Sequence, residues 1–226
     1  MNFNNFIDVC DNPAKKLSNT PLGKLLESFA ETLTDEYDKS LAKEVSGDST
    51  PDVSEKKETR ELTDEEKQFL RDKLGWTDKQ IAKCRIDEDG IIHYRTDRED
   101  LEGKTHESGV KYERKTIDIN GVKIEGVFPV FDSQFDAQLP PELQKASNPS
   151  QFAECNKQLK EAIKNDPELA KQFTEEQLED IMNGDTPKGY SWHHNEEVGK
   201  MQLVKTKDHD RTQGGAPHTG GDALWG

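Results

Sequence analysis

Residues 189–226 read GYSWHHNEEVGKMQLVKTKDHDRTQGGAPHTGGDALWG, and this stretch decides how the chain must fold around its most reactive side chains. Four of the six histidines lie in it: His193, His194, His209 and His218. Neutral imidazole keeps a lone pair available near neutral pH, so histidine is the commonest transition-metal ligand and a frequent general base. A His-His pair followed by two spaced histidines on a polar, Gly-rich segment therefore predicts a metal and acid–base site.

The same stretch has the pattern of a strand, a returning strand and a short helix. Residues 190–194 lead into a turn, residues 199–204 return, and a helix beginning near Thr206 would carry Asp208 and His209. This order sets the His-His pair opposite the helix, a layout that can close a small metal site. Two alternatives stay open: a metal that only stabilises a small C-terminal subdomain, and no metal at all.

Composition and charge limit the partners of the chain. Its 226 residues carry a formal net charge of −15, with 34% charged and 31% hydrophobic residues. This hydrophobic fraction is low for a single compact globular domain, so part of the chain is expected to stay unpacked. Nucleic-acid-binding proteins normally have a basic surface, because neutralising phosphates supplies most non-specific affinity. The charge thus argues against an extended phosphate-binding surface, but not against a local site that contains a divalent metal ion.

Cysteine spacing and hydropathy indicate neither a disulfide framework nor a membrane segment. Cys10, Cys84 and Cys155 are odd in number, far apart and without a CxxC pair, so isolated thiols in a reducing cytoplasm are expected. No apolar run reaches membrane-spanning length, and residues 1–5 lack the basic start of a cleaved signal peptide. We expect no membrane insertion and an export route without a cleaved signal peptide.

The first sixty residues divide into an apolar helix and a polar connection. Thr20 and Pro21 are the residue types preferred at the N-cap and first position of a helix, and apolar residues follow at helical spacing. We expect residues 1–43 to form a helical N-terminal appendage, whose apolar stripe could pack on this chain or on another protein. Residues 44–61 are rich in Ser, Gly, Pro, Thr and charges, which predicts a flexible linker.

Residues 62–103 are expected to form a small helix-helix-strand region. Thr63 with Glu66, and Thr77 with Gln80, each have the capping-box spacing that marks a helix N-terminus. A short strand over residues 90–94 is expected after the second helix.

Residues 104–226 predict a mixed domain that ends in the histidine-rich stretch. Asn120-Gly121 lies between two alternating apolar and charged segments, which is the strongest short signal for a β-hairpin. Residues 152–182 have helical apolar spacing with several helix starts. The predicted fold class is therefore α+β: a helical appendage and linker, then a mixed domain with the functional motif at residues 189–226.

The other histidines and the tryptophans have simpler explanations. His93 is expected in an exposed strand and His106 in a solvated loop, so neither is a predicted metal ligand. Trp76 is expected to anchor packing between two helices. Trp192 and Trp225 are expected to pack in the core or in a lid and not to stack on bases.

The histidine-rich stretch resembles a known family. The matching segments are Trp192-His193-His194, Gly199 to Val204, His209, His218 to Gly221, and Leu224 to Gly226. Together they resemble the Trp-His-His branch of the HNH (ββα-metal) endonucleases, which is common at the C-terminal ends of bacterial polymorphic toxins. Upstream, residues 126–140 and 152–182 also look like the region that precedes the motif, so the likeness covers roughly the second half of the chain.

The resemblance implies a role for each histidine. His193 would ligate a divalent metal, His194 would be the general base, and His209 with His218 would complete the ligand set. Residues 210–217 make the last interval longer than is usual in the family, which leaves Asp208 or Asp210 as alternative third ligands. Zinc, magnesium, nickel and manganese all remain open as the single divalent ion.

The resemblance also implies a function: metal-dependent endonucleolytic cleavage, with DNA as the expected substrate, by an antibacterial toxin effector. It implies a cognate immunity protein, and residues 1–43 could bind a secretion carrier or chaperone. The toxin would be made in the bacterial cytoplasm and delivered to the cytoplasm of a target cell by a specialised route. The alternatives are an RNase on the same motif and a non-catalytic binding module with a structural metal. For Lys205, Lys207 and Arg211, phosphate contact and plain solubility are equally compatible with the sequence.

Overall fold

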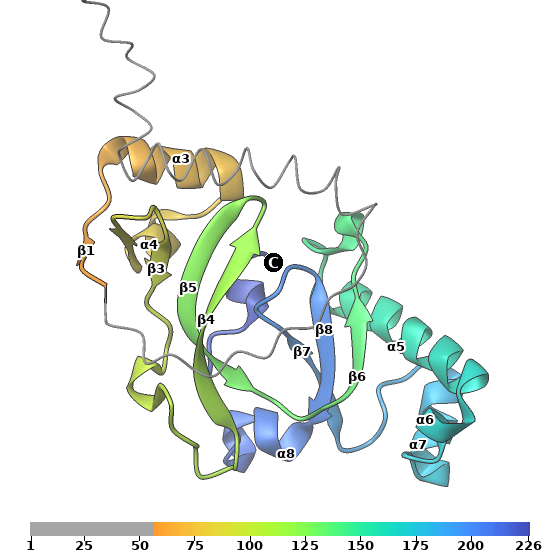
Figure 1. The fold of residues 1–226 in the computed structure, drawn as a ribbon. Coiled ribbons are helices and arrows are strands. Elements are labelled where there is room, and N and C mark those ends of the chain that lie inside the picture. The colour runs from red at the N-terminus through yellow and green to blue at the C-terminus, as the bar shows by residue number, and fades with distance from the viewer. Residues whose placement is uncertain (1–56) are drawn as a thin grey trace, which may run out of the picture.

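A computed structural model describes residues 57–226 of the chain (Figure 1). The appendage expected over residues 1–43, most of the linker expected over 44–61, and Cys10 lie outside the described residues. Within the described part, no helix is long and apolar enough to cross a membrane.

The described chain opens with two capped helices and three short strands. The elements are β1 (Thr59–Arg60), α3 (Asp64–Leu74), α4 (Asp78–Ile81), β2 (Cys84–Asp87) and β3 (Ile92–Tyr94). Both predicted capping boxes are confirmed: the Thr63 and Thr77 side chains each accept a bond from the third helical backbone N–H. In each box the third helical residue bonds back to the cap, so two helix-end N–H groups are satisfied at each start.

The predicted hairpin is confirmed and forms one end of a five-stranded sheet, with β4 as the edge strand. Strands β4 (Lys111–Ile119) and β5 (Val122–Val130) pair antiparallel around Asn120 and Gly121. Both turn residues have positive φ, 54° and 83°, as this tight turn requires. The strand order is β1-β2-β3-β5-β4, and β3 lies parallel to β5 while the other pairs are antiparallel.

This sheet changes two boundaries expected from composition. Thr59 and Arg60 pair with β2, so regular structure begins inside the stretch assigned to the linker, which extended to residue 61. The Arg85 guanidinium secures this strand by donating to the Thr59 hydroxyl and backbone carbonyl. The β3–β5 pairing also joins residues on both sides of the boundary expected at 103 and 104, so these two regions share one sheet.

A second, three-stranded sheet carries the histidine-rich stretch. Its strands β6 (Ser133–Gln138), β8 (Lys200–Lys205) and β7 (Tyr190–His194) lie side by side in that order, so β7 is an edge strand (Figure 1). Helices α5 (Asn148–Asn165), α6 (Pro167–Ala170) and α7 (Glu175–Asn183) connect β6 to β7. The short helix α8 (Thr206–His209) follows β8, and two single-turn 3₁₀ helices, η3 (Arg211–Gln213) and η4 (Gly221–Ala223), complete the chain.

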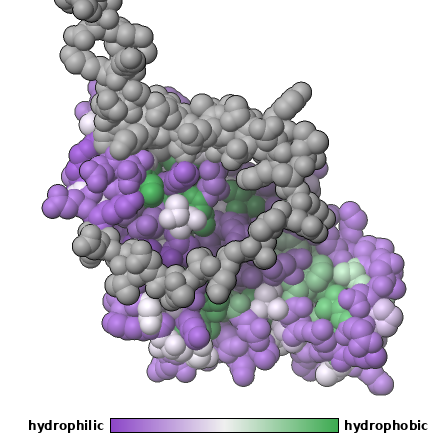
Figure 2. All heavy atoms as spheres, in the orientation of Figure 1, coloured by the Kyte–Doolittle hydropathy of each residue, from purple (hydrophilic) through white to green (hydrophobic). Residues whose placement is uncertain are grey.

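The two sheets share one hydrophobic core. Its buried side chains come from α3, α5, both sheets and the last residues of the chain, including Trp192 and Trp225. Cys84 on β2 and Cys155 on α5 are both buried free thiols in this core. Hydrophilic residues predominate on the face that Figure 2 shows, with smaller hydrophobic areas between them. The fold is α+β, as predicted from the sequence.

Candidate functional site

The candidate site is built by the end of β7, helix α8 and the loop that follows η3. β7 pairs with β8 in a register that sets His193 opposite Gln202 and His194 opposite Met201. Helix α8 is tied to the start of β7, because Thr206 N donates to Gly189 O (2.9 Å) and its hydroxyl bonds that of Ser191 (2.9 Å). These bonds hold the α8 histidine beside the strand.

Three of the four histidines converge. His193, His209 and His218 each offer one ring nitrogen, and these atoms lie within 4.8 Å of one another. The ring centroids of the three pairs are 4.8 to 5.3 Å apart. The ring of Phe131, at the end of β5, contacts all three imidazoles at centroid distances of 4.7 to 5.6 Å. An aromatic side chain thus forms an apolar floor under the histidine triad.

The triad, in which His193 is buried and His209 and His218 are partly buried, is neutral near neutral pH and could hold a cation. Burial, reinforced by the neighbouring histidines, holds the pKa of His193 well below its usual value. Burial and His218 lower the pKa of His209 to about 4, and burial also lowers the pKa of His218. His193 is 2% exposed, and among residues 57–226 its Nε2 has no hydrogen-bond partner. Because buried polar atoms nearly always have a partner, this nitrogen fits a metal ligand.

The loop that carries His218 is held from several directions. His218 Nδ1 lies 2.8 Å from Ala216 O and donates to it, so the lone pair of this ring is on Nε2. Arg211 donates to the His218 carbonyl (2.7 Å), and Tyr112 donates to the Pro217 carbonyl. Thr219 accepts a bond from the backbone of Asp97 (2.9 Å).

The long interval between His209 and His218 is taken up by a compact turn. Gly215 N bonds Asp210 O (2.9 Å) and Ala216 N bonds Asp208 O (2.8 Å), so the chain returns to α8. The Asp210 carboxylate accepts bonds from Thr212 and Gln213 and caps η3. The three side chains brought to ligand distance of one another are therefore the histidines, without Asp208 or Asp210.

His194 lies on the other face of β7, as strand periodicity requires. Its ring packs between Phe152 and Trp225, with centroids 5.8 and 5.7 Å away, and its Nε2 is 2.6 Å from Gln151 Oε1. The side-chain amide of Gln151 donates to the carbonyls of Leu143 (3.0 Å) and Gln144 (2.8 Å). Gln151 Oε1 can then only accept, so His194 carries its proton on Nε2 and presents the Nδ1 lone pair. Burial lowers the pKa of His194, which keeps the ring neutral.

Residues 120–220 match the DNase/tRNase domain of colicin-like bacteriocin. The matched part runs from the β4–β5 turn to the His218 loop and contains all four histidines of the site. Neither the curated proteins nor the solved structures contain a match to the chain. The family match supports a nuclease toxin activity and a nucleic-acid substrate.

The other predicted site residues are less central. Lys205 and Lys207 are exposed, and Arg211 is engaged with the His218 carbonyl and the Asp97 carboxylate. His93 lies between two carboxylates, with Nε2 3.0 Å from Asp87 and Nδ1 3.0 Å from Glu125. His106 Nδ1 lies 2.9 Å from the Ser108 hydroxyl, so both histidines have partners outside the triad.

Three contributors to the site have no local signal in the sequence. Phe131 floors the triad, Gln151 orients His194, and Lys115 on β4 pairs with Glu196 (2.6 Å), which is 2% exposed. Each comes from an element far from the histidine-rich stretch, so only the tertiary fold brings it there. The positive charge of Lys115 also helps to lower the pKa of His193, after burial and the other histidines.

Proposed function

We propose that this chain is an HNH-type, metal-dependent endonuclease that hydrolyses phosphodiester bonds, mainly of DNA, as an antibacterial toxin. The observation that carries the proposal is the histidine triad, with its unpartnered Nε2, beside a fourth histidine whose Nδ1 lone pair is available. The family match at residues 120–220 supports the same nuclease activity.

His193, His209 and His218 would hold one divalent ion. All three supply neutral imidazole nitrogens, a ligand set that suits zinc or nickel better than magnesium. When bound, such an ion supplies charge stabilisation at the phosphate and the leaving oxygen. The compact turn between His209 and His218 supports His218 as the third ligand in preference to Asp208 or Asp210.

His194 would act as the general base. Its neutral ring, held by Gln151 in the Nε2–H tautomer, accepts a proton from water at Nδ1. The water oxygen then attacks phosphorus, and the bond to the leaving oxygen breaks. His194 directly follows His193 at the end of β7, so the proposed base and the proposed metal ligands lie at the same end of that strand.

The toxin role implies partners. A producing cell would need a cognate immunity protein, as for other bacteriocin-type nucleases, and delivery would use a carrier or chaperone bound through residues 1–43. An RNase acting on the same histidines is the second candidate, since the matched domain is described as DNase/tRNase. A binding module with a structural metal is the non-enzymatic alternative.

The test is cleavage by the purified full chain. Supercoiled plasmid and tRNA are incubated with the metal-free protein, then with zinc, nickel, manganese or magnesium added singly. We expect plasmid nicking that EDTA abolishes and a transition metal restores. Faster cleavage of tRNA than of plasmid would select the RNase alternative.

Two substitutions separate catalysis from metal binding. His194→Ala should abolish cleavage and leave metal stoichiometry intact, whereas His193→Ala should lose the metal. Cleavage that persists in the His194→Ala variant would exclude His194 as the base. A metal-loaded wild-type chain without any nuclease activity would favour the binding module.

A further inference from the structure

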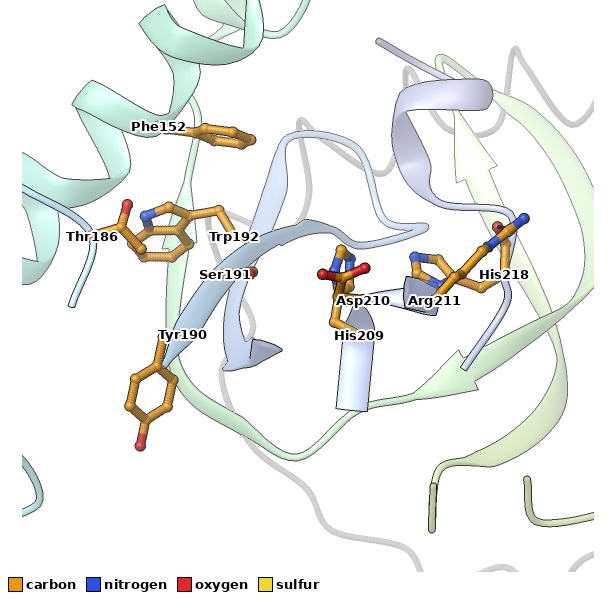
Figure 3. Close-up of a pocket in the computed structure, with 9 residues that line it drawn as sticks. All are labelled: Phe152, Thr186, Tyr190, Ser191, Trp192, His209, Asp210, Arg211 and His218. Atoms are coloured by element: carbon orange, nitrogen blue, oxygen red, sulfur yellow. Dashed lines mark hydrogen bonds between the residues drawn. The ribbon is translucent and has the colours of Figure 1, made fainter. Parts of the chain in front are cut away.

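A cleft of about 700 Å³ extends from the histidine triad along the edge of β7. His209, Asp210, Arg211 and His218 line one end, and Phe152, Thr186 and Trp192 line the other (Figure 3). A nucleotide fits a cleft of this volume, which is within the range of about 300–1,000 Å³ typical of small-molecule sites. The phosphate chemistry proposed above would occupy only the histidine end.

The far end of the cleft has the chemistry of a nucleobase site. Phe152 is partly exposed, and its ring lies 5.8 Å, centroid to centroid, from the ring of His194. Trp192 is buried and forms the wall, with its Nε1 donating to Asn156 (2.7 Å). Thr186 donates its hydroxyl proton to the same Asn156 oxygen (3.2 Å), so the Thr186 oxygen keeps acceptor capacity. An aromatic face beside a hydroxyl acceptor can stack on a base and bond its edge.

The charges around the cleft favour an unpaired strand over a duplex. Duplex binding depends on several phosphate contacts made by cations at once. Here four cations are bonded to carboxylates within the protein: Lys115 to Glu196, Lys188 to Glu176, Lys200 to Asp136 and Glu197, and Arg211 to Asp97. Lys205 and Lys207 are exposed beside the triad and leave only two lysines there for phosphate contacts. Binding of a single strand can add base stacking to the few phosphate contacts that are available.

We propose that Phe152 stacks on the base of a nucleotide next to the scissile phosphate, and that the protein cleaves single-stranded or locally melted DNA in preference to duplex. A base can reach this ring only after it leaves the duplex stack. Because Phe152 contacts the His194 ring, stacking there sets the phosphate beside the proposed proton acceptor. The inference rests on the proposed nuclease function.

The experiment uses the full chain loaded with the metal that supports cleavage. An end-labelled single-stranded oligonucleotide is cut alone, in duplex form, and in a series with one abasic residue moved along the strand. The variants are Phe152→Leu and, as a matched control, Phe69→Leu, since Phe69 is also partly buried but lies on α3 away from the cleft. Metal stoichiometry and the circular dichroism spectrum report on folding.

Wild type should cut the single strand at least about tenfold faster than the duplex, and an abasic residue should suppress cleavage at one adjacent phosphate by about tenfold. Phe152→Leu should raise KM about tenfold on the intact strand and remove the abasic effect, while Phe69→Leu behaves as wild type. Equal cleavage of both strand forms, or no abasic effect in wild type, would overturn the base site and leave the nuclease proposal standing. Absence of cleavage of every substrate would overturn the nuclease proposal itself.

Discussion

At the scale of single residues, the site depends on two adjacent histidines that point to opposite faces of one strand. His193 faces the triad and His194 faces α5, because successive side chains of a strand alternate. An edge strand can place both beside one substrate, since nothing pairs with its outer side in the described sheet. The adjacency of the two residues thus gives two distinct environments: a buried imidazole in the triad, and an imidazole whose Nε2 bonds Gln151.

Gln151 is predicted to act through His194. Gln151→Leu removes the acceptor that holds the Nε2–H tautomer, so kcat should fall roughly 10- to 100-fold while metal affinity stays the same. The measurement is steady-state cleavage, together with the ¹⁵N signals of His194, which should shift from one tautomer to a mixture. Gln158→Leu is the matched control, since Gln158 lies on the same helix and bonds the backbone of β6. An unchanged tautomer in Gln151→Leu would refute this role.

At the scale of elements, His93 joins three strands of the larger sheet. It lies on β3 and bonds Asp87 of β2 and Glu125 of β5, both at 3.0 Å. The bond to Glu125, with Asp87 adding to it against the effect of burial, raises the pKa of His93. The charged ring therefore bonds the strand on each side of β3, the antiparallel β2 and the parallel β5.

This connection predicts a pH-dependent stability. A group whose pKa is raised by folding stabilises the protein below its unfolded pKa of 6.5, and the stabilisation is lost as pH rises through the folded pKa. His93→Gln should lower the free energy of unfolding by about 1.5–3 kcal/mol at pH 6 and by less at pH 8.5. Urea unfolding of both chains at the two pH values measures the difference. The same loss at both values would contradict the assignment.

Local signals account for most elements that could be predicted. The capping boxes at Thr63 and Thr77, the Asn120-Gly121 hairpin and the strand ending in His193-His194 depend on neighbours in sequence, and all appear. The parallel β3–β5 pairing and the single sheet across residues 103 and 104 depend on distant contacts, which periodicity does not encode. The same limit applies to the site: spacing indicated the histidines, but not Phe131 or Gln151.

At the scale of the whole molecule, residues before the family match hold the end of the chain. Trp76 Nε1 donates to Leu224 O (2.7 Å), and Gln80 donates to Ala223 O (3.0 Å). Asp97 and Tyr112 hold the segment around His218 in the same way. The matched region, residues 120–220, is thus held by the Asp97 backbone N–H and the Tyr112 hydroxyl, which lie outside it.

Trp76→Phe tests this arrangement. It keeps an aromatic ring but leaves the buried Leu224 carbonyl without its donor, so the free energy of unfolding should fall by about 1–3 kcal/mol. Gln80→Glu is the comparison: it keeps the Thr77 capping acceptor, loses an exposed bond to the tail, and should cost less. Chemical denaturation measures both. A larger loss for Gln80→Glu would show that the Trp76 bond is unimportant.

Metal removal is predicted to destabilise the whole fold. An ion that binds only the folded chain stabilises it by about 2.7 kcal/mol at 100 times its Kd, which corresponds to a rise in Tm of roughly 5–10 °C. Thermal melts of the EDTA-treated protein, with and without added zinc, measure the shift. His193→Ala should melt at the same temperature in both conditions, and a shift that persists in this variant would place the ion elsewhere.

The reactivity of the two buried cysteines can report on local unfolding of the core. Burial raises the pKa of both the Cys84 and the Cys155 thiol to about 12, so neither forms the thiolate that alkylating reagents attack. Cys84 belongs to the five-stranded sheet and Cys155 to the helix beside the three-stranded one. Iodoacetamide would therefore label each cysteine only when the sheet or helix that carries it unfolds locally. Equal labelling rates at Cys84 and Cys155 would mean that both parts of the protein unfold in one cooperative step.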